Sequence, residues 1–153
     1  MFVSAITSST WSAADEERSL AILGRLMLEE IAGCGTAEQC RGLLVAIGRR
    51  LAGLLPVANE AELAVLAERI NGFWATLKWG SVGFELDDEG IDIIHRGLPP
   101  PERDQLQDWG ELLPPVLEGA YDHWFRQMGS DSTRLHTRVI RTAAGQVELR
   151  HGL

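Results

Sequence analysis

The sequence predicts an α+β fold with an antiparallel sheet. Two observations lead to this class: apolar residues recur at helical spacing through the first half of the 153-residue chain, and later alternate with polar ones in paired short stretches. The predicted order is three N-terminal helices, a β-hairpin, a long central helix and a C-terminal β-hairpin. We expect a single domain over residues 1–153, with residues 1–14 as an N-terminal arm.

Helical periodicity predicts the first three elements. The first spans residues 15–32, with three acids at its start. Thr36 is placed to cap the second helix and Asn59 to cap the third. Gly72, in the middle of the third helix, suggests the close approach of a neighbouring helix.

Strict alternation predicts the strands. Residues 81–86 and 91–95 read as one hairpin around the polar turn 87–90, and residues 135–141 and 146–151 read as another.

The central element is a helix over residues 109–128. Its apolar residues fall on one face, which must be buried, at Leu113, Leu117, Ala120, Trp124 and Met128. Proline suits a first helical turn and breaks an interior. We therefore expect the regular helix to begin near Pro114.

Composition excludes several classes. Apolar residues make up 45% and charged residues 24%, and the net charge is -8, which argues against a nucleic-acid binder or a polybasic membrane anchor. No apolar stretch reaches the roughly 20 residues that a membrane helix needs, so no membrane insertion is expected. The first residues lack the basic region of a signal peptide. The charge is unevenly distributed: residues 85–122 are strongly acidic and residues 132–153 are basic. This pattern fits either a solvated surface or opposite patches that pair between subunits.

Cys34 and Cys40 are the only cysteines, and no histidine stands near them at metal-ligand spacing. Reduced thiols are favoured over a disulfide, consistent with the cytoplasm. No cofactor and no metal site are predicted.

Three blocks of sequence carry a family resemblance. They are Leu77-Lys78-Trp79-Gly80-Ser81-Val82, Ile93-Ile94-His95-Arg96-Gly97-Leu98-Pro99 and Leu113-Pro114-Pro115-Val116-Leu117-Glu118-Gly119-Ala120-Tyr121-Asp122-His123-Trp124. In this order and spacing they resemble the D subunit of bacterial cellulose synthase systems. The match is clear over residues 60–128, whereas the remainder of the chain matches only in its layout, that is, in the order of its predicted elements.

The resemblance implies a noncatalytic accessory subunit of cellulose biosynthesis, a ring-like homo-octamer built as a tetramer of dimers, which promotes the crystallisation of cellulose. Its implied partners are the cellulose synthase complex, a proline-rich accessory protein and a β-1,4-glucan chain. It could organise glucan chains within the ring, or act as an intracellular scaffold that aligns synthases. We expect it in the cytoplasm near the inner-membrane synthase, with the periplasm as the alternative.

Aromatic residues are the candidates for contact with sugar rings. Trp79, Trp109, Trp124 and Tyr121 could stack on them, but such residues more often fill cores and subunit interfaces. The expected core or interface set is Trp79, Gly80, Leu117, Tyr121 and Trp124. In the arm, the uncharged, hydroxyl-rich segment Ser8, Ser9, Thr10 and Trp11 suits a neutral glucan.

Titratable residues offer weaker alternatives. Glu118, Asp122 and His123 could be imagined as acid, base and partner, but carboxylates one turn apart rarely face each other across a substrate, so a solvated or interface face is expected and no catalytic residue is predicted. His95 on an apolar strand is expected to be a hydrogen-bonded core histidine. A metal site between His136 and His151 is a weaker possibility.

Two rival functions stay open. The strand-strand-helix-strand-strand order also resembles small-ligand sensors of the vinyl-reductase-like type, which would hold a metabolite or haem below the central helix. A carbohydrate-active enzyme would release soluble sugars from β-glucan, whereas a scaffold would release none.

Overall fold

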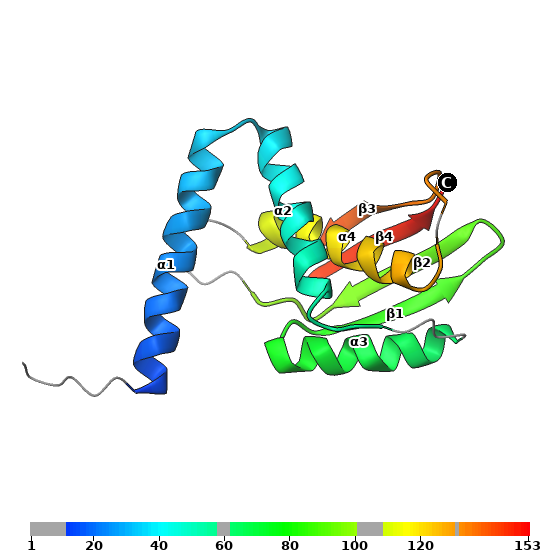
Figure 1. Cartoon of the computed structure of the whole chain (residues 1–153), viewed down its shortest axis with the longest axis horizontal. Coiled ribbons are helices and arrows are strands. Elements are labelled where there is room, and N and C mark those ends of the chain that lie inside the picture. Colours follow the sequence, from blue (N-terminus) through cyan, green and yellow to red (C-terminus); the bar gives the residue numbers. More distant parts are fainter. Residues whose placement is uncertain (1–11, 58–61, 101–108, 131) are drawn as a thin grey trace, which may run out of the picture. The chain divides into compact units, whose positions relative to one another are not determined.

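The computed structural model describes residues 12–57, 62–100, 109–130 and 132–153. Its elements are α1 (Ala13–Cys34), α2 (Ala37–Ala52), α3 (Leu63–Leu77), β1 (Ser81–Leu86), β2 (Gly90–Arg96), α4 (Trp109–Gln127), β3 (His136–Ala143) and β4 (Gln146–Gly152) (Figure 1). The predicted α+β class and both hairpins are confirmed. The chain divides into two compact units, Met1–Ala37 and Glu38–Leu153, and each is considered by itself.

Helix α1 begins earlier than predicted because Ser12 caps it. The Ser12 hydroxyl accepts the Asp15 N–H over 3.2 Å, and the Asp15 carboxylate accepts the Ser12 N–H over 3.1 Å. The Ser12 hydroxyl also donates to the Asp15 carboxylate over 2.6 Å, and this bond, followed by the one from the Ser12 N–H, lowers the pKa of Asp15. No residue of α1 is buried.

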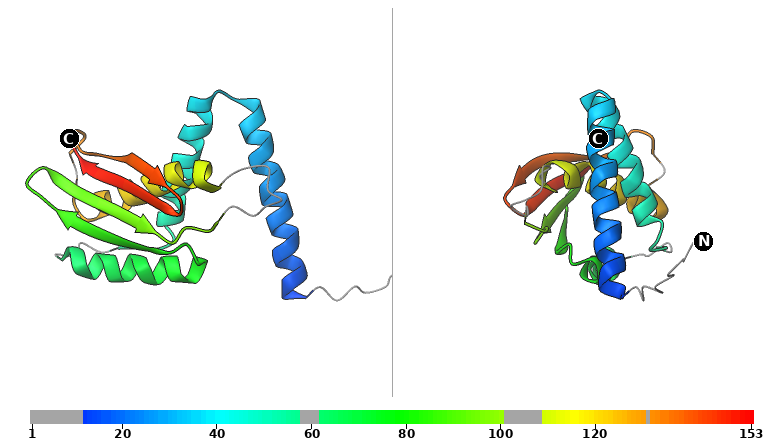
Figure 2. Two further views of the ribbon diagram at one scale, coloured as in Figure 1. Left: turned by 180° about the vertical axis from the view of Figure 1, so that it is seen from behind. Right: turned by 90° about the vertical axis from the view of Figure 1, so that its left-hand side faces the viewer.

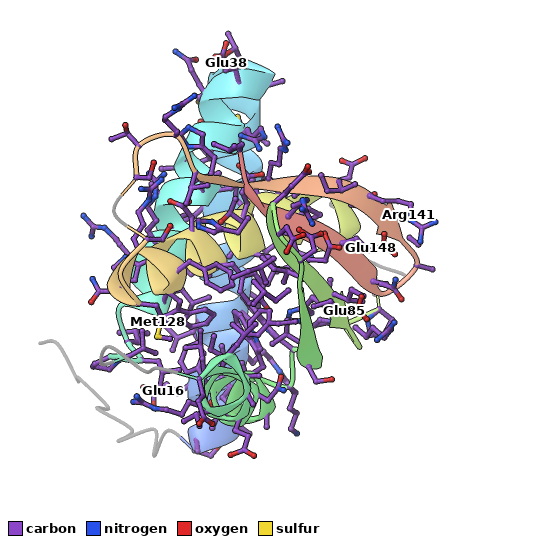
Figure 3. All side chains as sticks on the ribbon, turned by 90° about the vertical axis from the view of Figure 1, so that its right-hand side faces the viewer. Glu16, Glu38, Glu85, Met128, Arg141 and Glu148 are labelled. Carbon is purple, nitrogen blue, oxygen red and sulfur yellow. The ribbon has the colours of Figure 1, made fainter. Side chains whose placement is uncertain are left out.

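The four strands form one antiparallel sheet in the order β1-β2-β4-β3. Helix α4 covers one face: it lies in front of the sheet in Figure 1 and behind it in the left-hand view of Figure 2. On the opposite face, Figure 3 shows Glu85, Arg141 and Glu148 pointing away from α4. The Arg141 guanidinium donates to the Glu148 carboxylate there. Only one face of the sheet therefore contributes to the core.

Helix α4 starts at Trp109, so both prolines lie inside it and the predicted start near Pro114 is wrong. Neither proline can donate a hydrogen bond, but both lie within the second turn, and Pro114 is buried. The rest of the helix is buried on nearly every side. Leu117, Ala120, Tyr121 and Trp124 each have no exposed area, which makes α4 the central packing element, as the sequence indicated.

Helix α2 crosses α4 at backbone contact. A Cβ atom built on Gly48 would lie 1.9 Å from the Val116 carbonyl oxygen, and one on Gly119 would lie 2.0 Å from the Val45 carbonyl oxygen. Glycine on both helices is what allows this approach. The indole N–H of Trp124 then reaches the Ala52 carbonyl oxygen at the end of α2, over 3.1 Å.

Helix α3 lies beside the edge strand β1. It begins at Leu63, after Glu62, whose side chain makes no capping hydrogen bond; Asn59, the predicted cap, lies outside the described residues. Gly72 has no atom within 4 Å of a built Cβ, so the close approach predicted at this glycine is wrong. Asn71 links α3 to β1: its amide accepts the Val82 N–H over 2.7 Å and donates to the Val82 carbonyl oxygen over 3.0 Å.

In the part of the chain described, no helix combines the length and apolar character that crossing a membrane requires.

Candidate functional site

An aromatic–histidine cluster of Trp74, Trp79, His95 and Tyr121 occupies the core between α3, α4 and the sheet. The Trp74 indole N–H donates to the Tyr121 oxygen over 3.1 Å. The Tyr121 oxygen lies 2.6 Å from His95 Nδ1, and His95 Nε2 lies 2.6 Å from the Trp79 carbonyl oxygen. A carbonyl can only accept, so Nε2 carries the proton, Nδ1 accepts, and the tyrosine hydroxyl donates. Every polar atom of this buried chain has a partner.

Glycines bring the strand ends of this cluster together. Gly80 has φ +82°, and a Cβ there would lie 1.9 Å from the Arg96 carbonyl oxygen. Gly97, with φ +76°, lies against Gly80 from the other strand. Glycine is thus required at position 80, because no other residue fits this conformation and this approach.

Burial keeps the aromatic–histidine cluster neutral. It lowers the pKa of His95, although the hydrogen bond to Trp79 opposes this, and it raises the pKa of Tyr121 far above its ordinary value. Both ring nitrogens of His95 are engaged within the protein, as expected for a core histidine. Neither is available to a metal or haem.

Glu118 and Asp122 stabilise the other edge of the sheet. The Glu118 carboxylate accepts the Val139 N–H, and the Asp122 carboxylate accepts the Thr137 N–H, each over 3.3 Å. Both side chains are buried, with residue exposures of 8% and 6%. The expected solvated or interface face is therefore wrong: these carboxylates satisfy N–H groups of β3 that no further strand pairs.

Arginines balance these two carboxylates. Arg41 of α2 donates to Glu118, and Arg126 donates to Asp122 over 2.8 Å with Arg49 at 3.9 Å. Burial would raise the pKa of Asp122, but the Arg126 hydrogen bond and charge, the Thr137 N–H and the Arg49 charge together lower it. A carboxylate held ionised and fully engaged is a poor general acid or base.

His151 bridges two hydroxyls on the covered face. Its Nε2 lies 2.8 Å from the Ser130 hydroxyl and its Nδ1 lies 2.8 Å from the Thr137 hydroxyl. A serine beside a histidine can be a nucleophile, but that chemistry also needs hydrogen-bond donors that stabilise an oxyanion. The nearby N–H groups of Met128, Gly129 and Ser130 all donate to carbonyls in the last turn of α4, so these three do not provide such donors.

No metal site is formed by His136 and His151. His136 pairs with Gly152 and His151 with Thr137, so successive side chains place the two imidazoles on opposite faces of the hairpin. Among the described residues, no group of three or more His, Cys, Asp and Glu side chains could hold a metal ion. Cys34 and Cys40 form no disulfide.

Apolar surface is left uncovered on two helices. In α1, five large apolar residues are about half exposed or more: Leu20 61%, Ile22 48%, Leu23 54%, Leu26 51% and Met27 56%. Leu28 and Ile31 are partly exposed. In α2, Leu43 and Ile47 lie one turn apart and are 40% and 39% exposed. Apolar groups gathered on a surface in this way mark sites of interaction.

The structure places the remaining sequence candidates as follows. Trp79 and Gly80 are half-buried, whereas Leu117, Tyr121 and Trp124 are fully buried. The segment from Ser8 to Trp11 and the side chain of Trp109 lie outside the described residues. Sequence reasoning missed Trp74, Asn71, Gly48 and Gly119; the two helical glycines are a signal that could have revealed the crossing.

Together these features define an α+β protein whose buried polar side chains stabilise its core and its sheet edges. The chain belongs to the cellulose synthase D-subunit family, whose model matches residues 8–152. Its role is therefore in bacterial cellulose synthesis, as an accessory subunit associated with the cellulose synthase complex. No curated protein matches the chain.

Proposed function

We propose that this chain is a noncatalytic scaffold: it assembles into a ring-like homo-octamer that orders synthases or emerging glucan chains and so promotes the crystallisation of cellulose. Family membership supports the role in cellulose synthesis. The uncovered apolar face of α1 is the observation that carries the assembly. Most helices in proteins take their stability from the packing of an apolar face, so α1, with 22 residues and none of them buried, gains stability when its apolar face is covered.

The capped edges of the sheet favour assembly through helices over assembly through strands. Edge strands join other chains by offering unpaired N–H and C=O groups. At β3, Glu118 and Asp122 occupy two of these N–H groups, and at β1, Asn71 occupies both groups of Val82. The apolar faces of α1 and α2 remain as the surfaces for self-association. Many weak contacts in a closed ring would then act together.

Assembly is tested by light scattering on the purified full-length chain. We expect an eightfold chain mass, and a smaller species for Leu23→Ser with Met27→Ser. Ile140→Ser is the matched control, because Ile140 is also exposed, at 57%, but lies on β3. The altered α1 residues are outside the core, so circular dichroism should show the sheet and the other helices intact. A monomer at high concentration, or equal masses for all three proteins, would refute the assembly.

Function is tested in cellulose-producing cells that lack this subunit. The unaltered chain and Ile140→Ser should restore cellulose crystallinity, measured by X-ray diffraction of the product, and the α1 double variant should not. If the double variant restored crystallinity although it no longer assembles, the role in cellulose synthesis would not require the ring.

A further inference from the structure

The covered face of the sheet consists of rows of side chains, and the last row is incompletely covered. The middle row, Phe84, Ile93, Leu149 and Val139, lies under the helices, and its two central residues are 0% and 1% exposed. The next row is Leu86, Ile91, His151 and Thr137. His151 and Thr137 are buried, Ile91 is half-buried, and Leu86 is 72% exposed. The sheet thus extends beyond its helical cover on the β1 side.

A cavity of about 530 Å³ lies at this uncovered end. Its lining is mainly apolar and comes from three directions: Leu63 and Leu66 of α3, Leu86 and Ile91 of the hairpin, and Phe125 and Met128 at the end of α4. The volume falls within the range of pockets that bind whole small molecules, so it can take a large apolar side chain together with the residues beside it.

The β1–β2 turn forms an acidic wall of the same cavity. Asp87, Asp88 and Glu89 all line it and are exposed. Asp87 is fixed: it accepts the N–H groups of Glu89 and Gly90 over 2.8 and 2.9 Å, and Arg150 over 2.7 and 2.9 Å. The Arg150 hydrogen bond, then the Glu89 N–H, lower the pKa of Asp87 to about 2. The wall is therefore preformed and negative, and a preformed site loses little entropy on binding.

We propose that this cavity, the row-end cavity, binds a segment of another protein that inserts a large apolar side chain flanked by basic residues. Charge complementarity selects this occupant, since Asp87, which is paired with Arg150, stands with Asp88 and Glu89 beside a mainly apolar pocket large enough for a side chain and its flanking residues. The apolar anchor supplies most of the affinity and the flanking cations supply orientation and association rate. This surface lies in the unit Glu38–Leu153 and does not depend on the proposed assembly through α1.

Dye-labelled pentapeptides test the proposal by fluorescence anisotropy with the full-length chain. The probe is acetyl-Ala-Arg-Trp-Lys-Ala-amide; one comparison peptide replaces Arg and Lys by Glu, and another replaces Trp by Ala. We expect the probe to bind at least about tenfold more tightly than either. Its advantage over the Glu peptide should shrink as salt rises from 50 to 500 mM.

Two variants locate the binding. Leu86→Ser should weaken binding of the probe by about fivefold or more, because Leu86 lines the cavity. The substitution should not unfold the protein, since Leu86 is too exposed to contribute much to folding. Asp88→Asn with Glu89→Gln should weaken it about threefold at low salt and hardly at high salt. Ile140→Ser, exposed and remote from the cavity lining, should bind as the unaltered chain does.

A photoreactive benzophenone amino acid at position 86 tests directly whether the peptide or a second copy of this chain lies at the cavity. Cross-linking to the probe peptide in competition with unlabelled probe supports the proposal. Cross-linking of two copies of this chain through position 86 would make a second copy the occupant and overturn it. Equal affinity for all three peptides, or no effect of Leu86→Ser, would also overturn it.

Discussion

Replacement of Gly119 by alanine should destabilise the protein although alanine is the better helix former. Gly119 lies where α4 crosses α2, and a Cβ atom there would lie 2.0 Å from the Val45 carbonyl oxygen and 2.8 Å from its carbonyl carbon. These are backbone atoms in a helix, so no side chain can rotate away. The helices must separate by at least about 1 Å, and the reciprocal contact of Gly48 with Val116 opens with them.

The magnitude follows from two opposing effects. Overpacking costs about 1 to 3 kcal/mol, and a clash between two backbones belongs at the upper end. Alanine recovers about 1 kcal/mol of helix propensity. We therefore expect the free energy of unfolding to fall by about 2 kcal/mol. Separation also exposes Leu44 and Val45, which are 8% and 9% exposed in the structure.

Urea unfolding followed by tryptophan fluorescence measures this change, because Trp124 of α4 is fully buried and donates a hydrogen bond to the end of α2. Gly42→Ala on α2 and Gly72→Ala on α3 are the matched controls: neither added Cβ meets any atom within 4 Å. Both controls should raise the unfolding free energy, by up to about 1 kcal/mol. If Gly119→Ala stabilised the protein as the controls do, the inferred backbone contact between α2 and α4 would be refuted.

Two further predictions concern the buried polar groups. Tyr121→Phe leaves the Trp74 indole N–H without its acceptor and His95 Nδ1 without its donor, so the unfolding free energy should fall by about 2 to 4 kcal/mol, and an unchanged urea midpoint would contradict the hydrogen-bond chain. Burial lowers the pKa of both His95 and His151, so the unfolded chain binds protons first as pH falls. The free energy of unfolding is therefore highest above about pH 6.5 and decreases below it, by at most about 1.4 kcal/mol per pH unit for each histidine. His151→Asn should flatten the dependence between pH 7.5 and 5.5, the exposed control His136→Asn should not, and equal slopes in all three proteins would count against the buried, neutral imidazole.

The elements themselves could be predicted from the sequence because each depends on neighbours along the chain. Alternation in residues 81–86 and helical spacing in α4 report which face is buried, and both are local patterns. The predicted start of α4 failed at Pro114 because the preference of proline for a first turn is an average over many helices, whereas this helix is stabilised by burial on nearly all sides. The prediction for Gly72 failed for a related reason: a glycine in a helix does not say which side of that helix has a neighbour.

The candidate site was less accessible to sequence reasoning. Its residue types could be found, but not their pairing, since Glu118 and Asp122 look the same along the chain whether they face solvent or a strand edge. Only the fold places β3 within reach of their carboxylates and the arginines of α2 around them.

The sequence by itself determined the fold class, the order of elements, the importance of the Trp79-Gly80 pair and membership of a family. These follow from local periodicity and from residues that stand next to one another. The tertiary structure alone decided that three separate blocks meet in one hydrogen-bonded core, from Trp79 through His95 to Tyr121, and that one end of the sheet remains uncovered. The physical reason is that hydrogen bonds and cavities depend on distances between chain segments far apart in sequence, and those distances are set only when the hydrophobic faces have packed together.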